Sequence, residues 1–273
     1  MDENNSLAMK LVELAAGLSK ATVAYIDGPA GQTPFIALPP EWEAHTLEYT
    51  LPTPLRKMAR VTMDDTASFV LYFNTHCTEN SALYGILNPP KFMAVIDDNG
   101  HLGAGWRQHT ATYACPLSTE WETWTAKNKK QMSQADFAQF IEDNLPDIVS
   151  PDSATMLEVS RSLEAKKKVS FASGIRLSNG EVQFRYEEEI SGAVSKGQLT
   201  VPETFTLGIP VFNGGPLYSV EARLRYRIAD SGTLAMWYDL VRPHKVLEHS
   251  AKEVWGKIET DTATPILSGT PGI

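Results

Sequence analysis

Three arginines occupy alternate positions in the C-terminal third of the sequence, at Arg223, Arg225 and Arg227. They alternate with apolar residues along a predicted strand of residues 220–228, so we expect their guanidinium groups to form a row on one face, about 7 Å apart. Such a row suits phosphates or a line of carboxylates. Three interpretations stay open: cross-strand pairing with the acidic run 187–189, an acidic partner or subunit, and phosphate binding.

The phosphate interpretation extends to a nucleotide or single-stranded nucleic-acid binder, in which Arg185 and the lysine run 166–168 assist the arginine row. The net charge of −9 at pH 7 argues against this for duplex DNA over the whole surface, because that binding needs many cationic contacts. Nucleic acid therefore remains an alternative partner and is not the favoured one.

The sequence contains two cysteines, Cys77 and Cys115. Two are too few for a disulfide scaffold and indicate free thiols in a reducing compartment, with a single bridge between them as the alternative. Each lies near a histidine, His76 or His109, but neither pair has the spacing of a zinc site, and no metal is predicted. A cysteine-dependent enzyme is a third, disfavoured alternative, since no nucleophile elbow surrounds either thiol.

No cofactor motif is present. The glycines of residues 100–105 have the wrong order and context for a dinucleotide fingerprint and indicate a turn. A phosphate-binding loop, a His-Glu-x-x-His zinc motif and a calcium loop are all missing from the sequence. We therefore predict no cofactor and regard catalysis as unsupported.

Two apolar patterns suggest contacts with other copies of the chain. Residues 5–20 predict a helix with a leucine stripe, and the Glu-Trp-Glu-Thr-Trp segment would place two tryptophans on one helical face. For both patterns, packing in the chain's own core is the competing interpretation. The candidate interface residues are Leu7, Leu11, Leu14, Leu18, Trp121 and Trp124.

The elements that must position these residues indicate an α+β fold with mixed, mainly antiparallel sheets, an N-terminal helix, a central helical segment and a C-terminal helix. Helices are expected from Asp64 or Asp65 to His76, from Ser133, from Asp152 or Ser153, and from Pro243. Alternating runs predict strands at 22–27, 34–38, 81–87, 91–97 and 106–115, and two hairpins at 169–187 and 220–240.

The pattern divides the chain into an α+β portion of residues 1–117, a central helical segment 118–168, and a hairpin and helix portion 169–259, all of which one domain could contain. The tail 260–273, rich in Thr, Pro and Gly, is expected to be disordered or an extended arm. The acidic start and the lack of a long apolar run indicate a cytoplasmic protein without a membrane partner.

The segment from Val201 to the turn Asn213-Gly214-Gly215-Pro216, followed by residues 220–228 and by Leu240-Val241-Arg242-Pro243, resembles the YfdQ-like family of phage and prophage proteins. The resemblance covers nearly the whole chain. It implies a phage-related origin and expression inside the infected bacterium. That family is uncharacterised, so the resemblance implies no reaction and no catalytic residue.

The leading hypothesis is a non-enzymatic phage protein that acts in the host cytoplasm. It would work by self-assembly into a ring, shell or other homo-oligomer, or by binding and sequestering a host protein or a small anionic ligand. The amphipathic N-terminal helix, the extended tail and the tryptophan pair motivate it.

Overall fold

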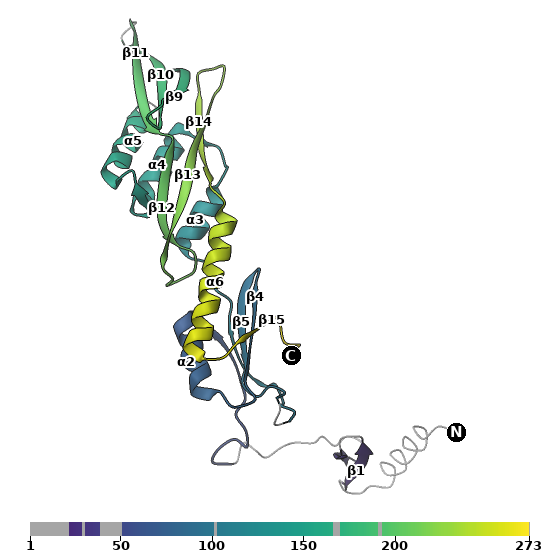
Figure 1. Ribbon diagram of the computed structural model, residues 1–273. Helices are drawn as coiled ribbons and strands as arrows, with labels where there is room; N and C mark the ends of the chain where they lie inside the picture. Colours follow the sequence, from purple (N-terminus) through teal and green to yellow (C-terminus); the bar gives the residue numbers. More distant parts are fainter. Residues whose placement is uncertain are drawn as a thin grey trace. The chain divides into compact units, whose positions relative to one another are not determined.

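The computed structural model describes residues 22–28, 31–38, 51–100, 103–165, 170–190 and 193–272 (Figure 1). The chain forms two compact units, Met1–Lys57 and Met58–Ile273. None of the helices in the described ranges has the length and apolar character needed to span a membrane.

The N-terminal unit contains one β-hairpin. Strand β1, Thr22–Gly28, pairs antiparallel with β2, Gly31–Ala37, from Thr22 opposite Ala37 to Gly28 opposite Gly31. Tyr25 lies opposite Pro34 in this ladder. Among the described residues the hairpin is a sheet of two strands only.

The first sheet of the larger unit is a three-stranded meander with an added strand on each side. Strands β4, β5 and β6 pair antiparallel in chain order. Both edges are parallel, because β3 pairs with β6 and β15 with β4. The strands are β3 (Ala59–Met63), β4 (Ala82–Leu87), β5 (Pro90–Val95), β6 (His109–Tyr113) and β15 (Ile266–Ser268).

Helix α2, Thr66–His76, packs against this sheet. It begins where Asp65, in extended conformation, accepts a hydrogen bond from the Ser68 backbone N–H at 2.8 Å. This satisfies one of the donors left open in the first turn of a helix. Phe69 and Phe73 point inward and are almost completely buried, so one face of α2 contributes to the core.

The central segment supplies three helices: α3 (Thr119–Lys127), α4 (Gln134–Asp143) and α5 (Ser153–Ala165). Ser118 and Ser133 cap the first two, each accepting from the backbone N–H three residues later. Asp152 accepts from Thr155 N–H in the same way at α5. Two short strands, β7 (Met132–Ser133) and β8 (Ile148–Ser150), interrupt the helices.

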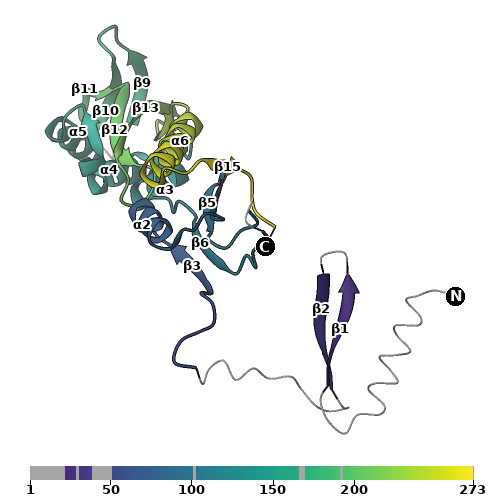
Figure 2. The ribbon, with the colours of Figure 1, turned by 60° about the horizontal axis from the view of Figure 1, so that its bottom comes forward.

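The remaining strands form two antiparallel sheets. The three-stranded sheet has the order β11-β10-β9, and the five-stranded one has the order β7-β14-β13-β12-β8. The strands are β9 (Ser170–Arg176), β10 (Glu181–Ile190), β11 (Ala193–Pro202), β12 (Thr204–Pro210), β13 (Leu217–Ile228) and β14 (Leu234–Leu240). In both views α4 and α5 lie together beside these sheets (Figures 1 and 2).

An aromatic cluster joins the central helices to the five-stranded sheet. The ring of Trp124 lies 4.9 Å from Phe140, 5.2 Å from Tyr238 and 5.8 Å from Phe205, centroid to centroid. The Tyr238 hydroxyl donates to the Trp124 carbonyl at 2.6 Å, which satisfies both buried polar groups. This packing fixes α3 and α4 on the sheet.

Helix α6, Pro243–Thr262, contacts both five-stranded sheets of the larger unit (Figure 1). It packs against β13 of one and against β4 and α2 of the other. The chain then returns as β15 along β4. The C-terminal segment 260–273 thus contains the end of α6 and the strand β15, which forms an edge of the sheet of β4–β6.

The α+β class with mixed, mainly antiparallel sheets is confirmed. The hairpins around Asn179-Gly180 and Ser231-Gly232 form as predicted, and both glycines have positive φ, at 84° and 78°. Glycine adopts this conformation without steric cost. The predicted N-terminal helix lies outside the described residues.

Candidate functional site

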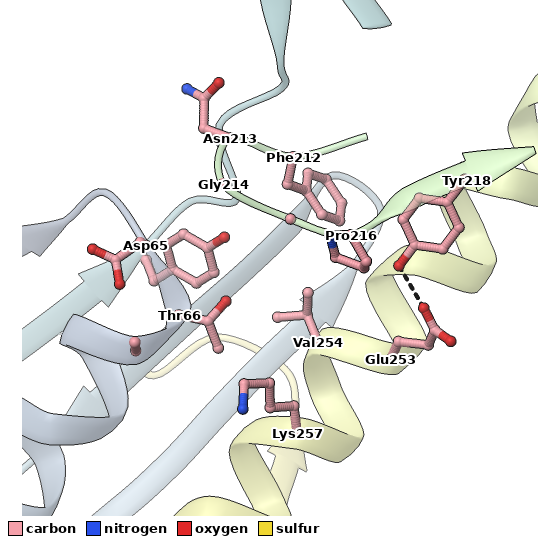
Figure 3. A pocket seen from close by; sticks show the side chains of 13 residues that line it. Asp65, Thr66, Phe212, Asn213, Gly214, Pro216, Tyr218, Glu253, Val254 and Lys257 are labelled. Carbon is pink, nitrogen blue, oxygen red and sulfur yellow. Dashed lines mark hydrogen bonds between the residues drawn. The ribbon is translucent and has the colours of Figure 1, made fainter. Parts of the chain in front are cut away.

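A cavity of about 230 Å³ lies where three parts of the larger unit meet (Figure 3). The first turn of α2 lines one side through Asp65 and Thr66, and the turn of residues 212–216 lines another. Helix α6 closes it with Glu253, Val254 and Lys257. We refer to it as the α2–α6 pocket.

The turn of residues 212–216 is shaped by its glycines. Gly214 has a φ of 68°, a left-handed conformation that most other residues adopt at a steric cost. The Gly215 N–H then donates to the Phe212 carbonyl at 3.0 Å and closes the turn. As a result Phe212 and Pro216 both line the pocket, as Figure 3 shows.

The charged groups around the pocket have partners within the chain. The Tyr218 hydroxyl donates to Glu253, and burial together with this bond raises the pKa of Tyr218. Lys257 donates to Asp261 at 2.8 Å. Hydrogen bonds from Ser68 lower the pKa of Asp65. Glu253 and Lys257 thus each have a partner in the part of the chain that the structure describes, and Asp65 is held by hydrogen bonds from Ser68.

The floor of the pocket is apolar. Tyr113 is 1% exposed, and burial raises the pKa of its hydroxyl to about 12. The described lining residues include no serine, cysteine or histidine. Its volume lies below the roughly 300–1,000 Å³ of sites for drug-sized ligands. The pocket suits one apolar side chain of a binding partner better than a substrate or cofactor.

The structure places Arg223 and Arg225 on one face of β13, as the alternation predicts, but both are paired. Arg223 Nε lies 3.0 Å from Glu221 Oε1, and Arg225 Nε lies 2.9 Å from Asp239 Oδ2. The ion-pair partners of these two arginines are thus Glu221 and Asp239, and not the acidic run 187–189 that one of the three interpretations named. The reason is topological, because β10 belongs to the three-stranded sheet and β13 to the five-stranded one.

The other two arginines of the candidate anion site do not complete it. Arg227 is exposed and forms no ion pair with a side chain that the structure describes. Arg185 is exposed on β10, where it lies opposite Gln198 of β11 and Ser173 of β9. These three strands form a different sheet from the one that contains the arginine row. One arginine without an ion pair among the described residues, on a row whose other two members are paired, is weak support for phosphate binding.

Trp121 and Trp124 do share a helical face, and that face points into the core. They are 4% and 0% exposed, and Trp124 Nε1 donates to Asp147 Oδ2 at 2.7 Å. Their position in the structure corresponds to the core interpretation, because neither indole is accessible to another copy. Leu7, Leu11, Leu14 and Leu18 lie outside the described residues.

The two cysteines differ in their exposure. Cys115 is buried, and desolvation raises the pKa of its thiol to about 12, so it is protonated and a poor nucleophile at neutral pH. Cys77 is exposed at the end of α2. Across the described ranges, no three histidine, cysteine, aspartate or glutamate residues gather in a way that could hold a metal ion.

The fold brings together one group that sequence reasoning missed. The rings of His76 and His109 lie 5.4 Å apart, and the Tyr72 hydroxyl lies 2.7 Å from His109 Nε2. This cluster joins α2 to β6, and packing between these two elements is enough to explain it. The α2–α6 pocket was also missed, although the glycine-rich turn that lines it stood out in the sequence.

Comparison with known proteins places the chain in a family without supplying a function. No curated protein and no solved structure matches it. A family model described as "Uncharacterized conserved protein (DUF2303)" matches residues 7–271, nearly the full length. The chain therefore belongs to the DUF2303 family of uncharacterised conserved proteins.

Proposed function

We propose that this protein is a phage-encoded, non-enzymatic component that works in the bacterial cytoplasm as an assembly of several copies. The YfdQ-like resemblance supports the phage origin. The N-terminal hairpin is the observation that carries the assembly, because among the described residues it is a sheet of two strands in a unit separate from the rest. An isolated two-stranded hairpin is at best marginally stable in water. A second chain that extends the sheet would supply the missing stability.

The two edges of the hairpin are not equivalent. Pro34 in β2 has no N–H, and proline occurs in strands where that side faces away from the ladder. The outer edge of β2 therefore lacks a backbone N–H donor in its middle. A proline at an edge is a common way for proteins to prevent another strand from pairing there. Strand β1 contains no proline, so its outer edge is the one that can accept another strand.

A second copy of the chain is the partner that we propose for β1. Antiparallel pairing of β1 with β1 of another copy gives a four-stranded sheet about a two-fold axis, which is the commonest symmetry of homo-oligomers. Two apolar side chains near the end of the N-terminal unit, Leu51 and Leu55, are 43% and 77% exposed. Their exposure supports a covered surface in this region.

The test is the mass in solution of the full chain and of Tyr25→Pro, measured by light scattering behind a sizing column. Tyr25 lies directly opposite Pro34, and residues directly opposite each other share the same hydrogen-bonding type. Its N–H therefore faces the free edge, and proline removes that donor without breaking a bond inside the hairpin. We expect an oligomer for the full chain and a shift toward the 30.1 kDa monomer for the variant.

Tyr25→Thr is the matched control, because threonine changes the side chain and keeps the N–H. It should stay oligomeric. A monomeric full chain would contradict the assembly and leave sequestration of a host factor as the better hypothesis. An oligomer of unchanged mass in Tyr25→Pro would place the contact elsewhere, and removal of residues 1–20 would then test the leucine stripe.

A further inference from the structure

A second hollow, of about 650 Å³, runs between helix α5 and strand β11. Its size falls within the range of ligand-binding sites. Val159 of α5 is partly exposed beside it, whereas Leu199 and Val201 of β11 line it from the buried core. Most of the other lining residues carry hydroxyl, amide or carboxylate groups. We call it the α5–β11 groove.

The groove follows the edge of a sheet. Five consecutive residues of β11, from Gln198 to Pro202, line it. Side chains of a strand alternate between its two faces, so a hollow that touches every residue in turn runs along the backbone edge. β11 is the terminal strand of its sheet, and no described strand pairs with its outer edge.

An open edge of this length is unusual for a stable protein. β11 spans ten residues, and native proteins commonly shorten such edges or cover them with a helix. Here α5 lies close to β11, yet the groove remains between them. Backbone N–H and C=O groups along an edge can bind an extended peptide as an added strand.

The charge of the groove indicates which peptide fits. Glu158 on α5 and Glu181 at the start of β10 are the charged residues among the described lining. The nearby Arg176 pairs with Glu203 at 2.9 Å and is not part of it. Two carboxylates with no cation among the described lining residues favour basic side chains. We propose that the α5–β11 groove binds an extended basic peptide segment, which joins the sheet as a strand beside β11.

The test uses a fluorescein-labelled heptapeptide, Lys-Thr-Lys-Val-Lys-Thr-Lys, and the full-length protein in fluorescence anisotropy. Two peptides are compared with it, one with glutamate in place of every lysine and one methylated on its backbone nitrogens. Each should bind more weakly by on the order of tenfold, through lost charge complementarity and lost strand pairing respectively. Hydrogen exchange should show new protection at the amides of Gln198 and Thr200, which face away from β10, when the basic peptide is bound.

The matched protein variants are Glu158→Gln with Glu181→Gln, and Glu120→Gln with Glu122→Gln on the exposed part of α3. The first pair should weaken binding of the basic peptide by on the order of tenfold, and the second should leave it unchanged. No binding at about 1 mM peptide, equal binding of the glutamate peptide, or full binding of the methylated peptide would each overturn the proposal. The oligomer test above is independent of this result.

Discussion

The two five-stranded sheets of the larger unit share a plan and differ at their edges. Each has a central antiparallel meander of three strands that follow one another in the chain, β4-β5-β6 in one and β12-β13-β14 in the other. The edges of the second, β7 and β8, come from the central helical segment and are antiparallel. The edges of the first, β3 and β15, are parallel and come from opposite ends of the unit.

This difference means that the two sheets depend on different contacts. The sheet of β12–β14 is held by the aromatic cluster around Trp124, which is formed by residues of the central helices and the sheet. The sheet of β4–β6 is held by α2 and by the C-terminal segment, where Trp255 packs on Phe92 at 5.8 Å. Substitutions in the two sheets should therefore differ in cost.

The largest effect is expected for Trp124→Ala. The variant removes a fully buried indole and its hydrogen bond to Asp147, so the free energy of unfolding should fall by about 3–5 kcal/mol. Urea denaturation measures the change. Trp255→Ala is the matched variant for the other sheet, and because this indole is only half-buried we expect about 1–2 kcal/mol. Equal losses would contradict the difference between the sheets.

The next effect concerns the contact between β4 and the C-terminal segment. A Cβ added at Gly85 would lie 2.7 Å from the Trp255 ring and 2.9 Å from Ile266, so Gly85→Ala should cost about 1–3 kcal/mol. Gly256→Ala in the exposed part of α6 meets no atom within 4 Å. It should instead stabilise the protein by about 0.5–1 kcal/mol through helix propensity. Thermal unfolding of both variants checks the opposite signs.

Asp65→Ala tests the cap of α2 and should cost about 1 kcal/mol at pH 7. Hydrogen bonds from Ser68 lower the pKa of Asp65 in the folded state, so its contribution is complete above the unfolded pKa of about 3.9. The difference between wild type and variant should disappear as the pH falls through the folded pKa. Asp64→Ala, next to the cap and exposed, is the control. A difference that persists at low pH would exclude the carboxylate as the cause.

The smallest effect is expected at the arginine row. Arg225→Gln breaks a partly exposed ion pair with Asp239 and should cost about 0.5 kcal/mol, and less at 1 M salt. Arg227→Gln should change the free energy of unfolding by less than that, since it breaks no described ion pair. Urea denaturation at two salt concentrations measures both. A large loss of unfolding free energy in Arg227→Gln would show that Arg227 makes a stabilising contact in addition to the ion pairs of Arg223 and Arg225.

The meanders and helices could be predicted because local signals specify them. Alternation and the turns Ser178-Asn179-Gly180 and Asp230-Ser231-Gly232 define the hairpins, and the caps at Asp65 and Ser133 define helix starts. The edge strands could not be predicted in the same way. β7, β8 and β15 have two or three residues each, too short for any periodicity to appear.

The candidate sites depended on long-range contacts and were predicted less well. Spacing along β13 gave the row of arginines, but the partner Asp239 follows from the register with β14. The α2–α6 pocket combines residues from positions 65 to 257, and no local pattern connects them. Pairing of residues 187–189 with the arginines could not be judged from spacing, because the two hairpins belong to different sheets and their relative position depends on the fold.

Helix α6 is packed against both five-stranded sheets, so its folding is shared between them. If either sheet unfolds, α6 loses part of the surface on which it packs, and its contacts with the other sheet are weakened as well. The larger unit should therefore respond to denaturant as one cooperative transition, and the slowest-exchanging amides of α6 should report the stability of the whole unit. A binding event at either sheet would raise that common stability and would be detectable far from the site of contact.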